Sequence, residues 1–307
     1  MLVFTILPVA NTLFRKADIS EKLIPATICA GVFTSSNLMW GTPSLSNVIP
    51  ASYLGTTLRA APLLSTVISI FYFAVSVLYV TWLAKRYKAK GIVNTTAGDS
   101  QSAEPGALRP PVYLAFLPII TVLVLMNAVR LDIVLSLLAG TVLVVVLFYK
   151  RLKSKIAIMT DGTGHAVSAA VNTAAAVGLG GIAIMTPAFT ALAEQIFRRF
   201  GTTYFSWSAI IGVISFFCGS AAGSLPVALG KYAETFLQAG LAPEALHKLA
   251  SSIAICIAPM PWCGTIVTIL AATKVSFKDG YPSMFVVDVV LGLATWLLCF
   301  ALCGILY

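Results

Sequence analysis

The sequence predicts an all-α integral membrane protein that contains two repeats of opposite orientation. Of its 307 residues, 59% are hydrophobic and only 10% are charged, and the mean hydropathy is +0.94. Soluble globular chains have about 45–50% apolar and about 25% charged residues. Two of the apolar runs are interrupted by Gly and Pro after matching lengths of chain. The composition excludes a soluble enzyme, a disordered tail and a coiled coil.

The formal net charge of +9 comes largely from short basic clusters between apolar runs, the strongest at residues 85–90 and 150–155. Lys and Arg are enriched in the cytoplasmic loops of membrane proteins. Both clusters therefore predict cytoplasmic ends of spans. Because the charges are divided in this way, nucleic acid is not an expected partner.

The apolar runs define the predicted membrane segments, because a helix of about 20 residues crosses about 30 Å of hydrocarbon. Residues 1–14 are short for a span and lack the charge order of a signal peptide. They predict one arm of a re-entrant hairpin, or the remainder of a longer protein. The run 206–237 is interrupted at 219–226 and predicts a hairpin that enters and leaves the membrane on one side. The other predicted spans are 23–53 (interrupted), 63–84, 112–129, 133–149, 166–193, 249–273 and 285–307.

The two interrupted runs predict an internal repeat. Twenty residues separate Glu21 from Gly41 in the first break, and 20 separate Glu244 from Gly264 in the second. Each break is followed by a long final run, and three spans between the units invert the second one. Inverted repeats with discontinuous helices are typical of secondary transporters, whereas two ordinary Pro kinks are the simpler alternative. The predicted division is residues 1–84 for the remainder of the first repeat, 85–111 for a cytoplasmic linker and 112–307 for the second repeat.

The two breaks and the hairpin tip form the predicted substrate site. Irregular backbone at membrane depth is tolerated where it lines a cavity or is buried in protein. The N-terminus of a half-helix carries partial positive charge, which suits a carboxylate, although Ser and Asn also hold membrane helices together. The candidate substrate-binding residues are Gly41, Thr42, Pro43, Ser44, Asn47, Gly219, Ser220, Gly223, Ser224, Pro261, Trp262, Gly264 and Thr265.

No residue pattern predicts an enzyme, a metal site or a cofactor. The six cysteines lie in apolar segments without paired spacing, and they are predicted to be packing thiols. His165 and His247 are far apart in sequence. No Ser–His–Asp set, paired intramembrane carboxylates or phosphate-binding loop is present.

Several segments resemble the gluconate permease (GntP) family of bacterial symporters. They are G-T-P-S-L-S-N-V-I-P at 41–50, L-G-T-T at 54–57, A-A-P at 60–62, G-S-A-A-G at 219–223, P-E-A-L-H-K at 243–248, P-W-C-G at 261–264 and K-D-G-Y at 278–281. The resemblance implies proton-coupled uptake of gluconate-like sugar acids, or other small hydroxy or amino carboxylates, across the bacterial inner membrane. The expected partners are the small organic anion, protons, the lipid bilayer and, on assembly, a second copy in a homodimer.

Two departures from the family pattern leave an alternative open. Ala258 and Trp262 replace an acid and an imidazole, and the chain is N-terminally shortened relative to the family. The alternative is a truncated, non-transporting remnant or a partner subunit of such a permease. Proton rather than sodium coupling rests on the resemblance alone. The remaining titratable candidates are Glu194, Glu234, His247 and Asp288, of which Glu234, His247 and Asp288 are expected at solvated membrane surfaces.

Overall fold

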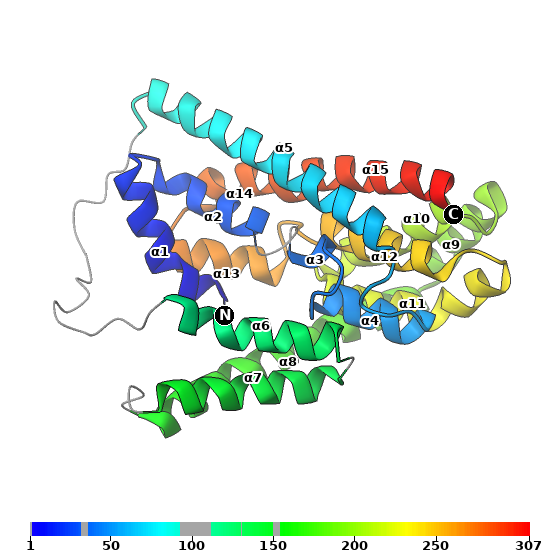
Figure 1. Ribbon diagram of the computed structural model, residues 1–307. Coiled ribbons are helices and arrows are strands. Elements are labelled where there is room, and N and C mark those ends of the chain that lie inside the picture. Colours follow the sequence, from blue (N-terminus) through cyan, green and yellow to red (C-terminus); the bar gives the residue numbers. More distant parts are fainter. Residues whose placement is uncertain (1, 32–35, 93–111, 130, 150–153) are drawn as a thin grey trace. The chain divides into compact units, whose positions relative to one another are not determined.

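The computed structural model describes residues 2–31, 36–92, 112–129, 131–149 and 154–307 (Figure 1). Helices dominate these residues, and none of them lies in a strand, which confirms the predicted all-α fold. Two helices in the described segments are long and apolar enough to cross a membrane. They are α5 (Pro62–Ala89) and the continuous helix Phe277–Leu306. The latter joins α14 (Phe277–Phe285), a π-helical turn (Val286–Val290) and α15 (Leu291–Leu306).

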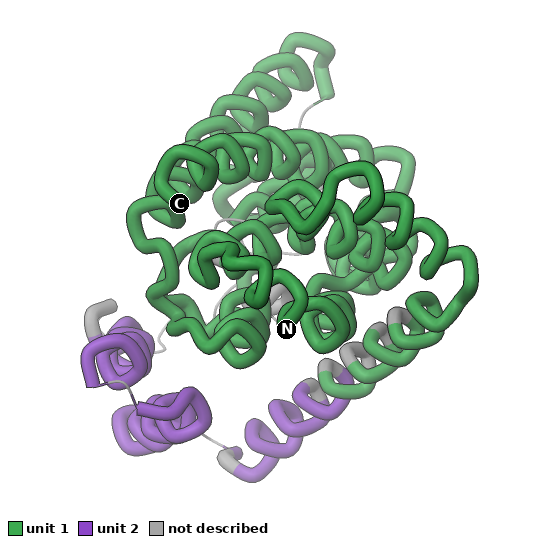
Figure 2. Tube along the Cα trace, turned by 90° about the vertical axis from the view of Figure 1, so that its right-hand side faces the viewer, with its two compact units in different colours: residues 1–94, 169–307 green, residues 95–168 purple. Residues whose placement is uncertain are grey.

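The chain divides into two compact units, residues 1–94 with 169–307 and residues 95–168 (Figure 2). The smaller unit contains α6 (Val112–Asn127), α7 (Ile133–Phe148) and the start of α8 (Lys155–Met185). Asp132 begins α7 by accepting hydrogen bonds from two backbone N–H groups of the first turn. The expected linker lies outside the described residues from position 93 onward.

Both predicted helix breaks are present in the larger unit. The first broken helix consists of α2 (Ile24–Cys29), α3 (Ser36–Leu38) and α4 (Leu45–Leu54). The second consists of α12 (Pro243–Ile257) and α13 (Gly264–Thr273). The non-helical segments are therefore 39–44 and 258–263.

The two broken helices match element by element. Their bounds are shifted by 219 positions, from Ile24 to Pro243, from Leu45 to Gly264 and from Leu54 to Thr273. The sequence pattern paired Gly41 with Gly264, and this register is wrong by four residues. Gly41 lies near the start of its break, whereas Gly264 begins the helix that follows. The error arose because either end of an unwound segment accepts Gly.

Contacts between the two broken helices, both within the larger unit, show that these helices run in opposite directions. His247 of α12 contacts Thr56, just after α4, while Ser251 one turn later contacts Ser46 near the start of α4. Helices α12 and α4 are therefore antiparallel. Helices α5 and α15 also pack together. The Glu244 carboxylate accepts hydrogen bonds from the Ala61 N–H, just before α5, and from the Tyr307 hydroxyl, just after α15.

Two further helices obey the same inverted relation. Helix α1 (Leu2–Lys16) packs against α13, and α11 (Ala221–Gln238) packs against α4. At the start of the opposite final span, Lys22 forms an ion pair of 3.0 Å with Asp279. The inverted repeat thus includes the hairpin arms, the broken helices and the final spans.

The predicted hairpin is formed by α10 (Tyr204–Cys218) and α11, but its turn is shorter than predicted. Gly219 ends α10 in the left-handed conformation, with φ +58°, and Ser220 caps α11 by accepting the Gly223 N–H at 3.2 Å. The interruption predicted to extend to Pro226 is wrong. Pro226 has no N–H to donate and its ring crowds the carbonyl four residues earlier, but its φ is helical and α11 continues through it.

A second span prediction was also wrong, because the run 166–193 is not one helix. Helix α8 ends at Met185 and α9 (Pro187–Phe200) begins after Thr186, with a bend of 75° between the flanking segments. The Thr186 hydroxyl caps α9 by accepting the Phe189 N–H at 3.3 Å. Pro187 has no N–H to continue the preceding hydrogen-bond ladder.

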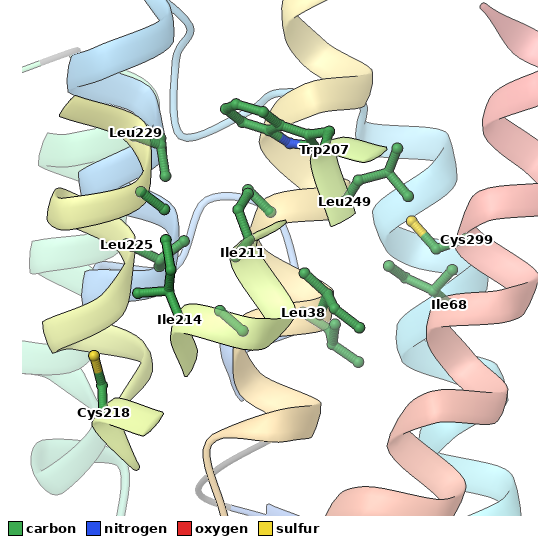
Figure 3. Close-up of a cluster of buried hydrophobic side chains, with 14 of the residues drawn as sticks. Leu38, Ile68, Trp207, Ile211, Ile214, Cys218, Leu225, Leu229, Leu249 and Cys299 are labelled. Carbon is green, nitrogen blue, oxygen red and sulfur yellow. The ribbon is translucent and has the colours of Figure 1, made fainter. Parts of the chain in front are cut away.

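The core of the larger unit joins the hairpin to the second broken helix (Figure 3). Trp207 and Ile211 of α10 lie beside Leu249 of α12, and the Trp207 indole donates a hydrogen bond of 2.9 Å to the Leu246 carbonyl. Leu225 of α11 belongs to the same buried cluster. The hairpin and α12 therefore form one packed body that holds the hairpin tip near the second break.

Candidate functional site

The first break contains a network of polar side chains. The Asn47 amide donates to the Met39 carbonyl at 3.0 Å and to the Thr42 hydroxyl at 2.6 Å. The Thr42 hydroxyl in turn donates to the Met39 carbonyl at 3.0 Å, and Ser44 lies 3.5 Å from Thr42. A carbonyl released by the end of α3 is thus satisfied by side chains, as buried backbone groups require.

Gly41 and Pro43 shape the backbone of this break. Gly41 has φ +73°, a conformation that favours glycine. Its N–H donates to the Leu58 carbonyl at 2.7 Å, so the break is tied to the segment that leads into α5. Pro43 is exposed beside it. The five predicted residues of the first break therefore form one continuous structure.

Lys248 of α12 extends this network across the repeats. Its ammonium donates to the Asn47 side-chain oxygen at 3.0 Å, and the residue is 1% exposed. The ion pairs found within the described parts of the chain, Lys22–Asp279 and Lys88–Asp18, do not include it. A buried ammonium is held here by an amide oxygen, which is a weaker partner than a carboxylate.

Sequence reasoning did not include Lys248 among the site residues. Lys248 immediately precedes the predicted span 249–273, whereas the candidate residues come from the two breaks and the hairpin tip. The signal was available in the helix period. A helix that starts at Pro243 places Lys248, Ser251 and Ser252 on one face, and Ser251 contacts α4 through the Ser46 carbonyl at 2.6 Å.

His247 is buried, and its expected position at a solvated surface is wrong. The side chain is 0% exposed, and its Nδ1 lies 2.7 Å from the Thr56 hydroxyl. Its Nε2 makes no hydrogen bond within the described structure. His247 and Lys248 of α12 attach the second broken helix to the first, because their partners Thr56 and Asn47 lie just after α4 and within α4.

The hairpin tip and the second break form a separate cluster. The Trp262 indole donates to the Phe216 carbonyl at 2.9 Å, and its ring meets the Phe216 ring edge-on at 4.9 Å. A Cβ added to Gly219 would lie 2.9 Å from Trp262. Although Trp262 is 51% exposed, its contacts with Phe216 and Gly219 join the second break to the hairpin tip. Pro261, Gly264 and Thr265 are also exposed.

The hairpin serines have structural partners. Ser220 caps α11 through Gly223, as described above. Ser224 is buried and lies 2.7 Å from the Ser215 hydroxyl on the facing arm. This bond closes the hairpin, so Ser224 is committed to the fold. The structure thus gathers the predicted residues into two clusters, one of which is polar and contains Lys248.

All six cysteines are free and buried, as predicted. Within the part of the chain that the structure describes, no group of three or more His, Cys, Asp or Glu side chains is placed to hold a metal ion. The candidate site accordingly consists of hydroxyls, amides, helix termini and one ammonium.

Comparison with known proteins links the chain to a transporter. It is 27% identical to a Bacillus subtilis (strain 168) protein named "Uncharacterized transporter YxjC" over 337 aligned residues, which cover 94% of this chain and 71% of that protein. No family model and no solved structure matches the chain. The likeness, the all-helical fold and the apolar spans together support a membrane transporter.

Replacing Thr42 by Val should destabilise the fold by about 1–2 kcal/mol, because Asn47 and the Met39 carbonyl each lose a partner. Thr268→Val is the matched control, since the Thr268 hydroxyl only returns to the carbonyl four residues earlier on exposed α13. Thermal unfolding in detergent measures both variants. Equal shifts for the two variants would show that the Thr42 network does not stabilise the break.

Proposed function

We propose that this chain is a proton-coupled secondary transporter of gluconate-like sugar acids, or of other small hydroxy or amino carboxylates, in the bacterial inner membrane. The observation that carries the proposal is the buried Lys248 ammonium at the first helix break, held by the Asn47 amide oxygen. Ionisable side chains within membrane segments are costly and usually functional.

The surroundings of Lys248 suit a small anion with hydroxyl groups. A buried cation is destabilising until an opposite charge joins it, and a substrate carboxylate supplies that charge. Helix α4 has ten residues and begins at the same break, so its N-terminus adds partial positive charge. The Thr42 and Ser44 hydroxyls lie beside it and are able to donate to, or accept from, the substrate's own hydroxyl or amino groups.

Proton coupling is supported by the resemblance of segments 41–50 and 219–223 to the gluconate permease family. The physical reason for coupling is electrostatic. A carboxylate that crosses with one proton carries no net charge, so the transporter moves the pair without work against the membrane potential.

The experiment is uptake by the purified chain in proteoliposomes with an imposed pH gradient. Gluconate, glycerate, D-serine and 3-hydroxybutyrate are the test substrates, with sodium replaced by choline. At least one should accumulate inside, and a protonophore should abolish the accumulation. If none accumulates with or without sodium, the result favours the alternative of a non-transporting partner subunit. Accumulation that requires sodium overturns the proton assignment.

A further inference from the structure

The last span contains a buried carboxyl group at an irregular point of its helix. The π-helical turn Val286–Val290 interrupts the α-helix, and Asp288 is its central residue. Asp288 is 0% exposed, so its expected place at a solvated interface is wrong. Single π turns inside α-helices occur frequently at functional sites. A carboxyl group within a membrane span adds a second reason to expect a function here.

The groups around Asp288 come from both repeats. The Cys29 thiol of α2 lies close enough to the carboxyl group to interact with it. The side chains of Cys256, Cys263 and Tyr281 interact with it electrostatically. From α5, the Tyr72 hydroxyl donates to the Val287 carbonyl at 3.4 Å. Among the described residues, these interactions place three thiols and one phenol near Asp288, and such groups are ordinarily neutral at pH 7.

Protonation of Asp288 therefore changes the charge of a buried region that contains these thiols and this phenol. The region also reaches the second break. Cys263 lies within that break, and the Tyr281 hydroxyl donates to the Pro259 carbonyl at 3.3 Å. A change of charge at Asp288 therefore alters the electrostatic environment of the unwound segment 258–263.

The inverted repeat relates this carboxyl group to the anion site. Cys29 and Lys248 occupy equivalent positions under the shift of 219 that relates the two broken helices. Lys248 contacts Asn47 at the first break, whereas Cys29 contacts Asp288 beside the second. Because the repeats are inverted, equivalent positions lie at equal depths below opposite membrane faces. Equivalent positions of the two repeats, Cys29 and Lys248, thus each lie beside a buried polar side chain, Asp288 and Asn47 respectively.

We propose that Asp288 carries the proton that is transported with the anion. The inference rests on the proposed function. Hydronium from one aqueous face protonates the carboxylate and leaves water. The carboxyl group gives the proton to water at the other face, and no other bond changes. One anion and one proton cross in each cycle.

The test compares two transport modes of Asp288→Asn in proteoliposomes. Accumulation driven by a pH gradient should fall by about tenfold or more, since Asn does not titrate. Exchange of labelled for unlabelled substrate at equal pH needs no net proton movement and should persist. Asp279→Asn is the matched control, because Asp279 lies in the same continuous helix but is exposed and paired with Lys22. It should retain gradient-driven accumulation.

Each outcome separates this inference from the proposed function. If the unchanged protein accumulates no substrate, both fail together. If it accumulates substrate and Asp288→Asn does so equally, the function stands and the Asp288 assignment is overturned. Loss of exchange as well as accumulation in folded Asp288→Asn also overturns it, because Asp288 then acts in binding. Should Asp288→Asn not fold, Cys29→Ala removes the thiol beside the carboxyl group and should shift the pH profile of uptake. An unshifted profile overturns the inference.

Discussion

Replacing Lys248 by Met should weaken binding of the proposed substrate anion by about 10- to 100-fold, the loss expected for a hydrogen bond to a charged group. The variant should remain folded. The substitution removes a buried charge and so relieves its desolvation. This gain offsets the cost of about 1–3 kcal/mol for leaving the buried Asn47 oxygen without its partner. Calorimetric titration of the detergent-solubilised protein with its substrate measures the affinity. Thermal unfolding of the same samples measures stability.

Lys231→Met is the matched control for this variant. Lys231 is an exposed lysine on α11 that reaches the Ile184 carbonyl at 3.5 Å. The substitution removes the same charge from the same unit of the protein, and substrate affinity should not change. An unchanged affinity in Lys248→Met would show that Lys248 only anchors α12 to α4. The anion site would then lie elsewhere.

Replacing Gly219 by Ala should destabilise the fold by about 2–5 kcal/mol, because two effects combine at the hairpin tip. A residue with a Cβ is strained by about 1–2 kcal/mol in the left-handed conformation, and Gly219 has φ +58°. The added Cβ would also lie 2.9 Å from Trp262 Cδ1. Overpacking of that kind typically costs about 1–3 kcal/mol. The midpoint of thermal unfolding in detergent should fall accordingly.

Gly240→Ala isolates the conformational part of this effect. Gly240 has φ +81°, and nothing lies within 4 Å of a Cβ built there. Its variant should lose only the backbone term. The double variant Gly219→Ala/Trp262→Ala should recover the steric term relative to Trp262→Ala alone. If Gly219→Ala and Gly240→Ala unfold at equally lowered temperatures, the contact between tip and Trp262 is not tight.

The sequence predicted the helix breaks well because their cause is local. Gly41-Thr42-Pro43 and Pro261 to Gly264 remove helical donors or permit unusual dihedral angles wherever they occur. Pro226 misled the same reasoning. Its single missing donor is tolerated once Ser220 has started α11 with a cap.

The polar contacts of the site were not predictable in the same way. Lys248 meets Asn47 across about 200 residues of chain, an interaction that depends on how α12 is placed along α4. Asp288 is buried because α2, α12 and α14 all pack around its turn. Hydropathy along one segment indicates depth in the membrane, but it does not indicate which neighbours cover that segment.

The inverted repeat also has a consequence for the direction of transport in the proposed function. An axis that exchanges the two halves also exchanges the two sides of the membrane, so a chain that obeyed it fully could not distinguish inside from outside. The backbone bounds follow the relation, but the side chains do not. Thr42 and Asn47 correspond to Pro261 and Ile266, and Lys248 corresponds to Cys29. For the proposed transporter, unmatched pairs such as these are therefore positions where a substitution changes the energetic difference between the state open to one side and the state open to the other.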